Sequence, residues 1–177
     1  TRTVHGFSQN LKGEKRMFEK FGEFDSCKEL NMAAEGLLEE GDTESLKILV
    51  DENGIDKDDC EDYELGLIDS LTTPLTAAYG KLNVEMAELK ITEIMEDWVQ
   101  YIKLQCLDSN EMASAVRKKG KSLKGCIALL LKWSYSNQYE VPADIIKASG
   151  ISAGRVTLGI PGAGTAHRLI KEYYLGK

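Results

Sequence analysis

A glycine-rich segment near the C-terminus contains the residue types from which phosphate-binding loops are built. Gly159 and Gly164 have the spacing of the two glycines in the motif G-x-x-x-x-G-K-S/T, and a helix is predicted to follow. However, Thr165 replaces the lysine that reaches the phosphates, and Ala166 replaces the hydroxyl residue that binds magnesium. The dinucleotide-binding pattern also fails, because His167 occupies the place of its third glycine. We therefore expect a tight turn without nucleotide hydrolysis, and a backbone nest for one nucleic-acid phosphate is the alternative.

Residue types that bind metals or catalyse reactions are present, but their spacing does not form a site. Residues 51–62 are acidic enough to suggest calcium, yet Gly54 and its neighbouring carboxylates are out of register for an EF-hand loop. His5 and His167 are far apart, and neither belongs to a local catalytic constellation. Reduced, buried and unreactive thiols are expected, because no CxxC pair occurs among Cys27, Cys60, Cys106 and Cys126. We predict no catalytic residue, no metal, no cofactor and no enzymatic activity.

Residues 143–156 resemble a helix-turn-helix motif of the kind that reads DNA. Gly150 would form the turn, and Val156, six residues later, would face the first helix. Ile146 stands where many such motifs need a small residue, and Pro161 would shorten the second helix. A structural helix-loop unit is therefore the favoured interpretation. In a DNA-reading motif, the side chains facing the major groove would be those of Ser152, Arg155 and Thr157.

Charge is distributed very unevenly along the chain, although the net charge is only −7. Residues 1–22 have a net charge of +3, and residues 23–65, with sixteen acidic and three basic side chains, have −13. Residues 66–112 carry −5, whereas residues 113–177, with eleven basic and three acidic side chains, carry +8. We expect the acidic and basic segments to form separate surfaces at the two ends of the molecule, each meeting its own macromolecular partner.

Two clusters of like charge contain the candidate binding residues, although either could be a solvated helix face that favours solubility. The acidic cluster would match a basic, nucleic-acid-binding surface on which carboxylates compete with phosphates. It consists of Glu39, Glu40, Asp58, Asp59, Glu61 and Asp62. The basic cluster would contact nucleic-acid phosphates. It consists of Arg117, Lys118, Lys119, Lys121, Lys124 and Arg155.

Length and composition indicate one ordinary globular domain. The chain has 177 residues, of which 42% are hydrophobic and 29% charged, and it contains only three prolines. No apolar run approaches the roughly 20 residues that span a bilayer. The N-terminus lacks the apolar core of a signal peptide. We therefore expect a cytoplasmic protein without membrane contact.

Helical patterns dominate, and they predict an all-α or mainly α fold built as a helical bundle. We expect residues 1–16 to be a mobile arm or an expression remnant, and residues 17–72 to be an acidic helical unit. Residues 73–137 form the predicted central bundle, and residues 138–177 a basic, glycine-rich helix-loop-helix unit, and we expect these units to form one compact domain overall. At most a short strand is expected, near residues 155–158.

Capping signals predict where several helices begin. Ser26 and Glu29 have the spacing of a capping box, and Pro74 after Thr73 is typical of a first helical turn. Further caps are expected at Asp42 or Thr43, Asp56 and Ser122. One long amphipathic helix is predicted over residues 84–106, because apolar residues recur there every three or four positions. Trp98 is expected to anchor the core within this helix.

Several phrases in the sequence resemble a family of small proteins from phages and mobile elements of Clostridia-type bacteria. These phrases are residues 17–26, 33–42, 52–56, 73–81, 117–125 and 156–162. Members of that family have been linked to anti-CRISPR inhibition of type II, RNA-guided Cas nucleases. The resemblance covers most of residues 17–177, excludes the leading arm, and brings no catalytic residues with it. It implies a non-enzymatic inhibitor.

The resemblance and the charge pattern together lead to two functional hypotheses. The first is stoichiometric inhibition of a type II CRISPR effector nuclease, in which the acidic cluster docks on a basic nuclease surface. DNA or guide RNA would then be a further ligand of the basic cluster in the same complex. The alternative is a DNA-binding accessory or regulatory protein of a mobile genetic element, built on the basic cluster and the helix-turn-helix resemblance.

Overall fold

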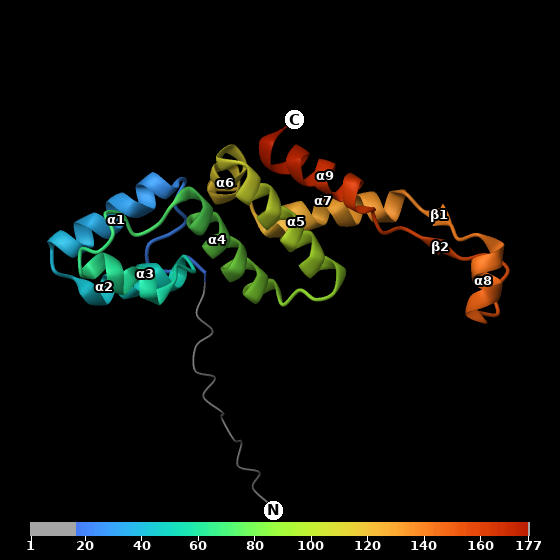
Figure 1. Ribbon diagram of the computed structural model, residues 1–177, viewed down its shortest axis with the longest axis horizontal. Helices are drawn as coiled ribbons and strands as arrows, with labels where there is room; N and C mark the ends of the chain where they lie inside the picture. Colours follow the sequence, from blue (N-terminus) through green and yellow to red (C-terminus); the bar gives the residue numbers. More distant parts are fainter. Residues whose placement is uncertain (1–16, 177) are drawn as a thin grey trace, which may run out of the picture.

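The structure, a computed structural model, describes residues 17–176, so the expectation for residues 1–16 lies outside the described part of the chain. The described residues are mainly helical and contain one two-stranded antiparallel sheet (Figure 1), which confirms the predicted fold class. The chain begins with α1 (Cys27–Glu39), α2 (Thr43–Glu52), α3 (Lys57–Glu64), α4 (Pro74–Leu89) and α5 (Ile94–Asp108). It continues with α6 (Asn110–Arg117), α7 (Leu123–Ser136), β1 (Tyr139–Glu140), α8 (Ala143–Ser149), β2 (Thr157–Leu158) and α9 (Ala163–Leu175).

The molecule is elongated, and three parts follow one another along its long axis (Figure 1). Helices α1, α2 and α3 form a unit at one end, α4 to α7 and α9 form a bundle in the middle, and the β1–α8–β2 extension projects from the other end. Two hydrophobic cores correspond to the first two parts. Helix α4 joins them, because its neighbouring residues Ala77 and Ala78 belong to different cores.

The N-terminal unit forms because short helices are capped and then packed against one another. The predicted caps are confirmed: the side chains of Ser26, Asp42 and Asp56 each accept a backbone N–H from the first turn of the helix that follows. The core between these helices includes the completely buried Leu30 and Leu49. Burial of such side chains is the main source of stability for helices this short.

The central bundle is built around α4, which contacts α5, α6 and α7. Thr73 and Thr76 form a reciprocal capping box at its start, and Pro74 occupies the first helical turn, as predicted. Helix α9 packs against α5, α6 and α7, so the C-terminal helix belongs to the core of the bundle. Trp98 is buried in this core, which confirms its predicted role as an anchor.

The prediction of one long helix over residues 84–106 is wrong, because α4 ends at Leu89 and α5 begins at Ile94. Lys90 adopts the left-handed conformation with φ of 51°, Glu93 also has a positive φ of 56°, and the chain reverses direction between these residues. The apolar pattern continued through the break because Ile91, which lies in the turn, is also buried in the core.

The β1–α8–β2 extension is a two-stranded ribbon that carries a short helix at its tip. Tyr139 pairs with Leu158 and Glu140 with Thr157, so the strand predicted near residues 155–158 is confirmed and β1 is its unpredicted partner. No residue of α8 is buried. Four large apolar side chains of this segment, Tyr139, Ile145, Ile151 and Leu158, are exposed, as is Ile160 just after it.

The structure contradicts the helix-turn-helix interpretation. Gly150 ends α8 in a left-handed conformation, as a turn residue should, but residues 151–156 form no second helix and the chain enters β2. Ser152, Arg155 and Thr157 therefore do not lie on a recognition helix. The favoured interpretation of a structural helix-loop unit agrees with this geometry.

Two glycines allow the N-terminal unit to approach the bundle closely. Gly54, just after α2, lies against Gly80 in the middle of α4. A Cβ atom added at Gly80 would overlap the carbonyl oxygen of Asn53, and one added at Gly54 would overlap the carbonyl oxygen of Gly80. Because backbone atoms occupy both sides of this contact, a larger residue can be accommodated only by separating the two elements.

We expect Gly80→Ala to lower the free energy of unfolding by about 1–3 kcal/mol, the usual cost of overpacking. The matched control is Gly36→Ala, because Gly36 lies within α1 and an added Cβ there meets nothing within 4 Å. The control should raise stability by about 0.5–1 kcal/mol, since alanine is the better helix former. Urea denaturation of both variants measures this contrast, and equal effects would contradict the close approach.

Candidate functional site

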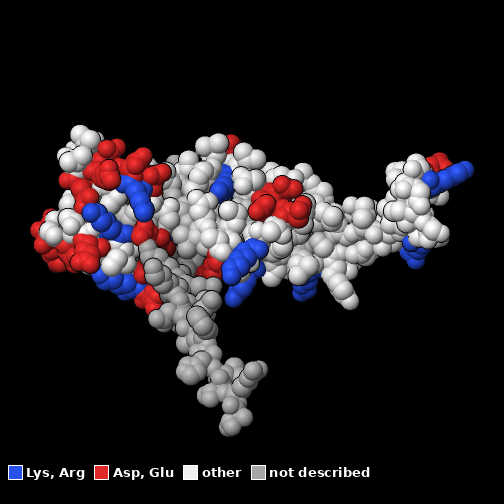
Figure 2. Space-filling view, turned by 90° about the horizontal axis from the view of Figure 1, so that it is seen from below, with Lys and Arg blue, Asp and Glu red and all other residues white. Residues whose placement is uncertain are grey.

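The acidic cluster is displayed at the end of the molecule formed by α1, α2 and α3. Figure 2 shows Asp and Glu side chains gathered over this end, with a few basic side chains among them. Glu39 and Glu40 lie at the end of α1, and the other four residues lie on α3. Asp59 is half-buried and the others are exposed. We call these six residues the acidic surface: Glu39, Glu40, Asp58, Asp59, Glu61 and Asp62.

A different set of carboxylates accepts hydrogen bonds from groups inside the fold. Glu52 is buried in the N-terminal unit, where its two oxygens accept the backbone N–H groups of Lys20 and Phe21. Glu23 and Glu85 bind groups of the central bundle instead. Counting charges along the sequence could not distinguish these interior carboxylates from those of the acidic surface, because both sets lie in segments with a negative net charge.

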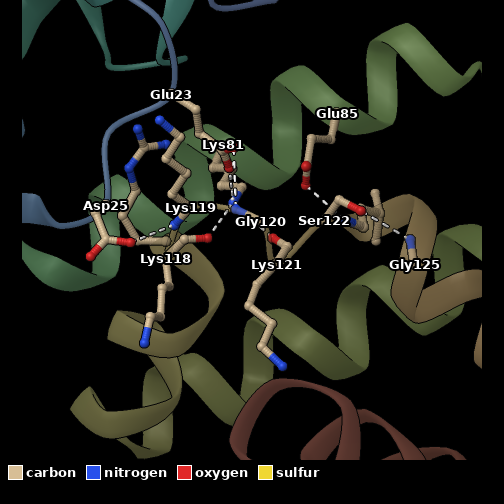
Figure 3. Close-up of polar contacts among 12 residues, drawn as sticks. Glu23, Asp25, Lys81, Glu85, Lys118, Lys119, Gly120, Lys121, Ser122 and Gly125 are labelled. Atoms are coloured by element: carbon tan, nitrogen blue, oxygen red, sulfur yellow. Dashed lines mark hydrogen bonds and ion pairs between the residues drawn. The ribbon is translucent and has the colours of Figure 1, made fainter.

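Lys81 connects the N-terminal unit to the bundle at the centre of a buried polar junction (Figure 3). Its side chain is 0% exposed, and its Nζ donates to Glu23 Oε1 at 2.6 Å. The same Nζ also donates to the backbone carbonyl oxygens of Lys118 and Lys121, at 2.9 and 2.7 Å. The three acceptors use all three donors of the ammonium group, so this buried charge is fully hydrogen-bonded.

The loop after α6 is also held through its backbone. The N–H of Lys119 donates to Asp25 Oδ1 at 3.2 Å, and the N–H of Gly120 donates to Glu23 Oε2 at 3.3 Å (Figure 3). Glu23 and Asp25 therefore bind a loop nearly 100 residues away in the sequence. Lysines in this loop contribute to the fold through main-chain groups, a role that their side-chain charge did not indicate.

Arg117 is misplaced in the predicted basic cluster, because it is 0% exposed. Its Nη2 donates to Asn53 Oδ1 at 2.8 Å, and its guanidinium lies 5.5 Å from the centroid of the Phe18 ring. Its Nε and Nη1 have no hydrogen-bond partner within residues 17–176. The sequence contains a signal for this burial: Arg117 follows Ala113 by four positions, on the same buried face of α6.

The remaining basic residues do not form a separate end of the molecule. Lys118 and Lys119 follow α6 and Lys124 lies in the first turn of α7, and all three are exposed on the central bundle. Lys121 is half-buried, and its Nζ donates to the Tyr173 carbonyl oxygen at 2.7 Å. Arg155, on the extension, forms an exposed ion pair with Glu140 at 2.6 Å. The expected separation into an acidic end and a basic end is therefore wrong.

Lys81 was missed by the sequence interpretation, although a pattern could have indicated it. Ala78, Lys81, Leu82 and Glu85 recur every three or four positions, which places two opposite charges on the core-facing side of α4. A single lysine and a single glutamate within an otherwise apolar stripe are typical of a buried ionic contact. Glu85 Oε2 accepts the backbone N–H of Leu123 at 3.0 Å, at the start of α7.

Burial raises the pKa of Glu85 to about 7. Glu23 raises it further, whereas Lys81, the Leu123 N–H and Arg117 lower it without offsetting the loss of water. The folded protein therefore holds this proton more tightly than the unfolded chain. This contribution to stability is fully present below a pH of about 4.5 and is lost as the pH rises through about 7.

We expect Glu85→Gln to abolish this pH dependence. The free energy of unfolding of the wild type, relative to that of the variant, should fall by about 2 kcal/mol between pH 5 and pH 8. Glu88→Gln, an exposed change one turn further along α4, is the control and should leave the difference constant. Chemical denaturation at several pH values gives both differences, and parallel curves for all three proteins would contradict the buried position of Glu85.

No catalytic arrangement emerges among the described residues. All four cysteines are free, and burial raises the pKa of Cys106 and Cys126 to about 12, as expected for unreactive thiols. The expectation of burial is wrong for Cys27, which is half-buried. His167 is half-buried, and its ring lies 4.7 Å from that of Tyr101. Within residues 17–176, no group of three or more His, Cys, Asp or Glu side chains could hold a metal ion. None of the helices in that range has the length and apolar character to cross a membrane.

The glycine-rich segment leads from β2 into α9 as extended chain. Gly159 lies against the end of α7, where an added Cβ would overlap the Ser134 carbonyl oxygen. Gly162 caps α9 without a side-chain hydrogen bond. Close packing at Gly159 accounts for one glycine of the apparent phosphate-binding pattern.

Comparison of the chain with protein-family models, curated proteins and solved structures gives no match.

Proposed function

We propose that this protein is a non-enzymatic inhibitor of a type II, RNA-guided CRISPR nuclease, and that it binds the nuclease through the acidic surface. Such a nuclease holds its guide–target heteroduplex in a positively charged channel. Carboxylates displayed on a rigid helical unit would compete with nucleic-acid phosphates for this channel. The family resemblance of residues 17–177 supports the same proposal.

One observation carries the proposal: within residues 17–176, no side-chain hydrogen bond or ion pair of the fold uses a carboxylate of the acidic surface. Ion pairing and backbone binding in the interior use Glu23, Asp25, Glu52 and Glu85. The six residues of the acidic surface lie outside that set, and five of them are exposed. Their charge is therefore directed toward a partner or toward solvent, and electrostatic attraction would speed association with a basic surface.

A cleavage assay tests the proposal with purified effector, guide RNA and target DNA. We expect cleavage to disappear as the protein is titrated to a ratio near one to one with the effector. Inhibition should weaken as salt rises, because charge pairs contribute to binding. Cleavage that continues at a large excess of the protein, with several effector orthologues, would contradict the proposal.

The DNA-binding alternative depends on fewer residues than the sequence suggested, because Arg117 is buried and no recognition helix forms. Its remaining basis is the set of exposed lysines Lys118, Lys119 and Lys124. It predicts that replacing these three with glutamine reduces DNA affinity and flattens its salt dependence. The inhibitor proposal predicts that the same variant still blocks cleavage.

A further inference from the structure

A groove on the N-terminal unit runs between α1 and the segment of residues 69–74, beside the acidic surface. It is a shallow, open groove with a volume of about 520 Å³. Its walls are fastened together, because the Asn31 side chain donates to the Thr72 carbonyl oxygen at 2.9 Å and accepts the Thr72 N–H at 3.0 Å. The groove is therefore a preformed feature of the fold, and a ligand would not have to open it.

Apolar side chains line this groove. Met32, on the α1 wall, is 59% exposed, Pro74 is half-buried, and the ring of Tyr63 is buried beneath them. The segment that joins Tyr63 to the opposite wall carries Leu65 and Leu67, which are both largely exposed. Methionine adapts its shape to different apolar partners and is common at surfaces that bind helices. A partner that covered the exposed apolar side chains would remove their surface from water, which would favour binding.

The charges around the groove are mainly negative. Glu35 and Asp69 line it, and Lys28 is the one basic side chain among the described residues that do so. The negative potential extends into the groove, because the carboxylates of Glu35 and Glu39 add to the effect of burial in raising the pKa of Tyr63. A nucleic acid is disfavoured here, since its phosphates would face these carboxylates.

We propose that this groove binds a basic amphipathic helix of a protein partner. The apolar side of that helix would cover Met32 and Pro74, and its Lys or Arg side chains would face Glu35 and Asp69. The groove follows α1 from Cys27 to Glu35, a distance of about 12 Å at 1.5 Å per residue, which matches two turns of a bound helix. The inference deepens the proposed function and rests on it for the identity of the partner, which would be the effector nuclease.

A binding assay without any nuclease tests the groove by itself. The probe is a fluorescent 18-residue peptide of leucine and lysine with all leucines on one helical face, and its partner probe has the same composition in scrambled order. We expect the amphipathic peptide to bind the full chain at least tenfold more tightly than the scrambled one in fluorescence anisotropy. Equal affinities, or no binding, would overturn the proposal.

Two variants of the full chain test whether the peptide binds in the groove. Met32→Gln and Glu35→Lys should each weaken binding of the amphipathic peptide at least fivefold. Their matched controls are Leu131→Gln on α7 and Glu88→Lys on α4, which alter an exposed apolar and an exposed acidic residue elsewhere in the molecule. The controls should leave the affinity unchanged, and losses as large as those of the groove variants would overturn the proposal. Thermal melts of all four variants establish that they are folded.

The nuclease assay then separates this inference from the proposed function. If the peptide binds as expected but the wild type does not inhibit cleavage, the groove stands and the proposed function fails. If the wild type inhibits cleavage but the peptide does not bind, the proposed function stands and the groove proposal is overturned. If both assays succeed, Met32→Gln should also raise the concentration needed for inhibition.

Discussion

Replacing Lys81 with methionine should lower the free energy of unfolding by about 3–5 kcal/mol, the usual consequence of removing one partner from a buried ion pair. Methionine fills a similar volume, so the loss comes from the polar groups that remain. Glu23 would retain a charge without its ammonium partner, and the carbonyl oxygens of Lys118 and Lys121 would lose their donor. Denaturant titration measures the change, with the slope of the transition reporting whether unfolding stays two-state.

Lys119→Met is the matched control for this prediction. Lys119 lies in the loop that Lys81 binds, but its side chain is exposed and only its backbone N–H contacts Asp25. The control should change stability by less than about 0.5 kcal/mol. A double-mutant cycle with Glu23→Leu adds a second test, because the two losses should be clearly less than additive if the charges pair. Similar effects of Lys81→Met and Lys119→Met would contradict the buried junction.

The junction explains why local sequence signals predicted the elements better than their assembly. Cap residues act within four positions of the chain, so Ser26, Asp56 and Thr73 could be identified from their immediate neighbours. Lys81 obtains its acceptors from positions 23, 118 and 121, and no short-range pattern specifies those partners. Arg117, the buried charge that the sequence analysis assigned to a cluster, was consequently predicted as a surface residue, since charged residues are rarely buried without a partner.

In the candidate site, too, the features set by local sequence could be predicted and those set by long-range contacts could not. Residues of the acidic surface follow from helix boundaries and charge alone, because α3 is a short, strongly acidic helix that buries only one side and α1 ends in two glutamates. The groove beside that surface could not be predicted, since it depends on the Asn31–Thr72 contact between residues 41 positions apart. The turn at Lys90 was also invisible, because neither glycine nor proline marks it and Ile91 preserves the apolar spacing.

Reversing four charges of the acidic surface should raise the concentration needed for half-maximal inhibition at least 100-fold. The variant combines Glu39→Lys, Glu40→Lys, Glu61→Lys and Asp62→Lys. If each reversal costs about 1 kcal/mol of binding at an interface rim, the total is equivalent to roughly a thousandfold in affinity. Asp58 and Asp59 are left unchanged, because they lie in the first turn of α3, where acidic side chains stabilise the helix.

The control reverses four exposed acidic residues outside the N-terminal unit, which produces the same change in net charge and leaves the first turn of every helix unchanged. It combines Glu88→Lys, Asp108→Lys, Glu140→Lys and Glu172→Lys. Inhibition should remain within a fewfold of the wild type, because these residues lie away from α1 and α3. Equal losses in both variants would indicate a long-range effect of net charge, and full inhibition by the first variant would exclude the acidic surface as the contact. Under the DNA-binding alternative, both variants should instead bind DNA more tightly, because each removes the same repulsion from phosphates.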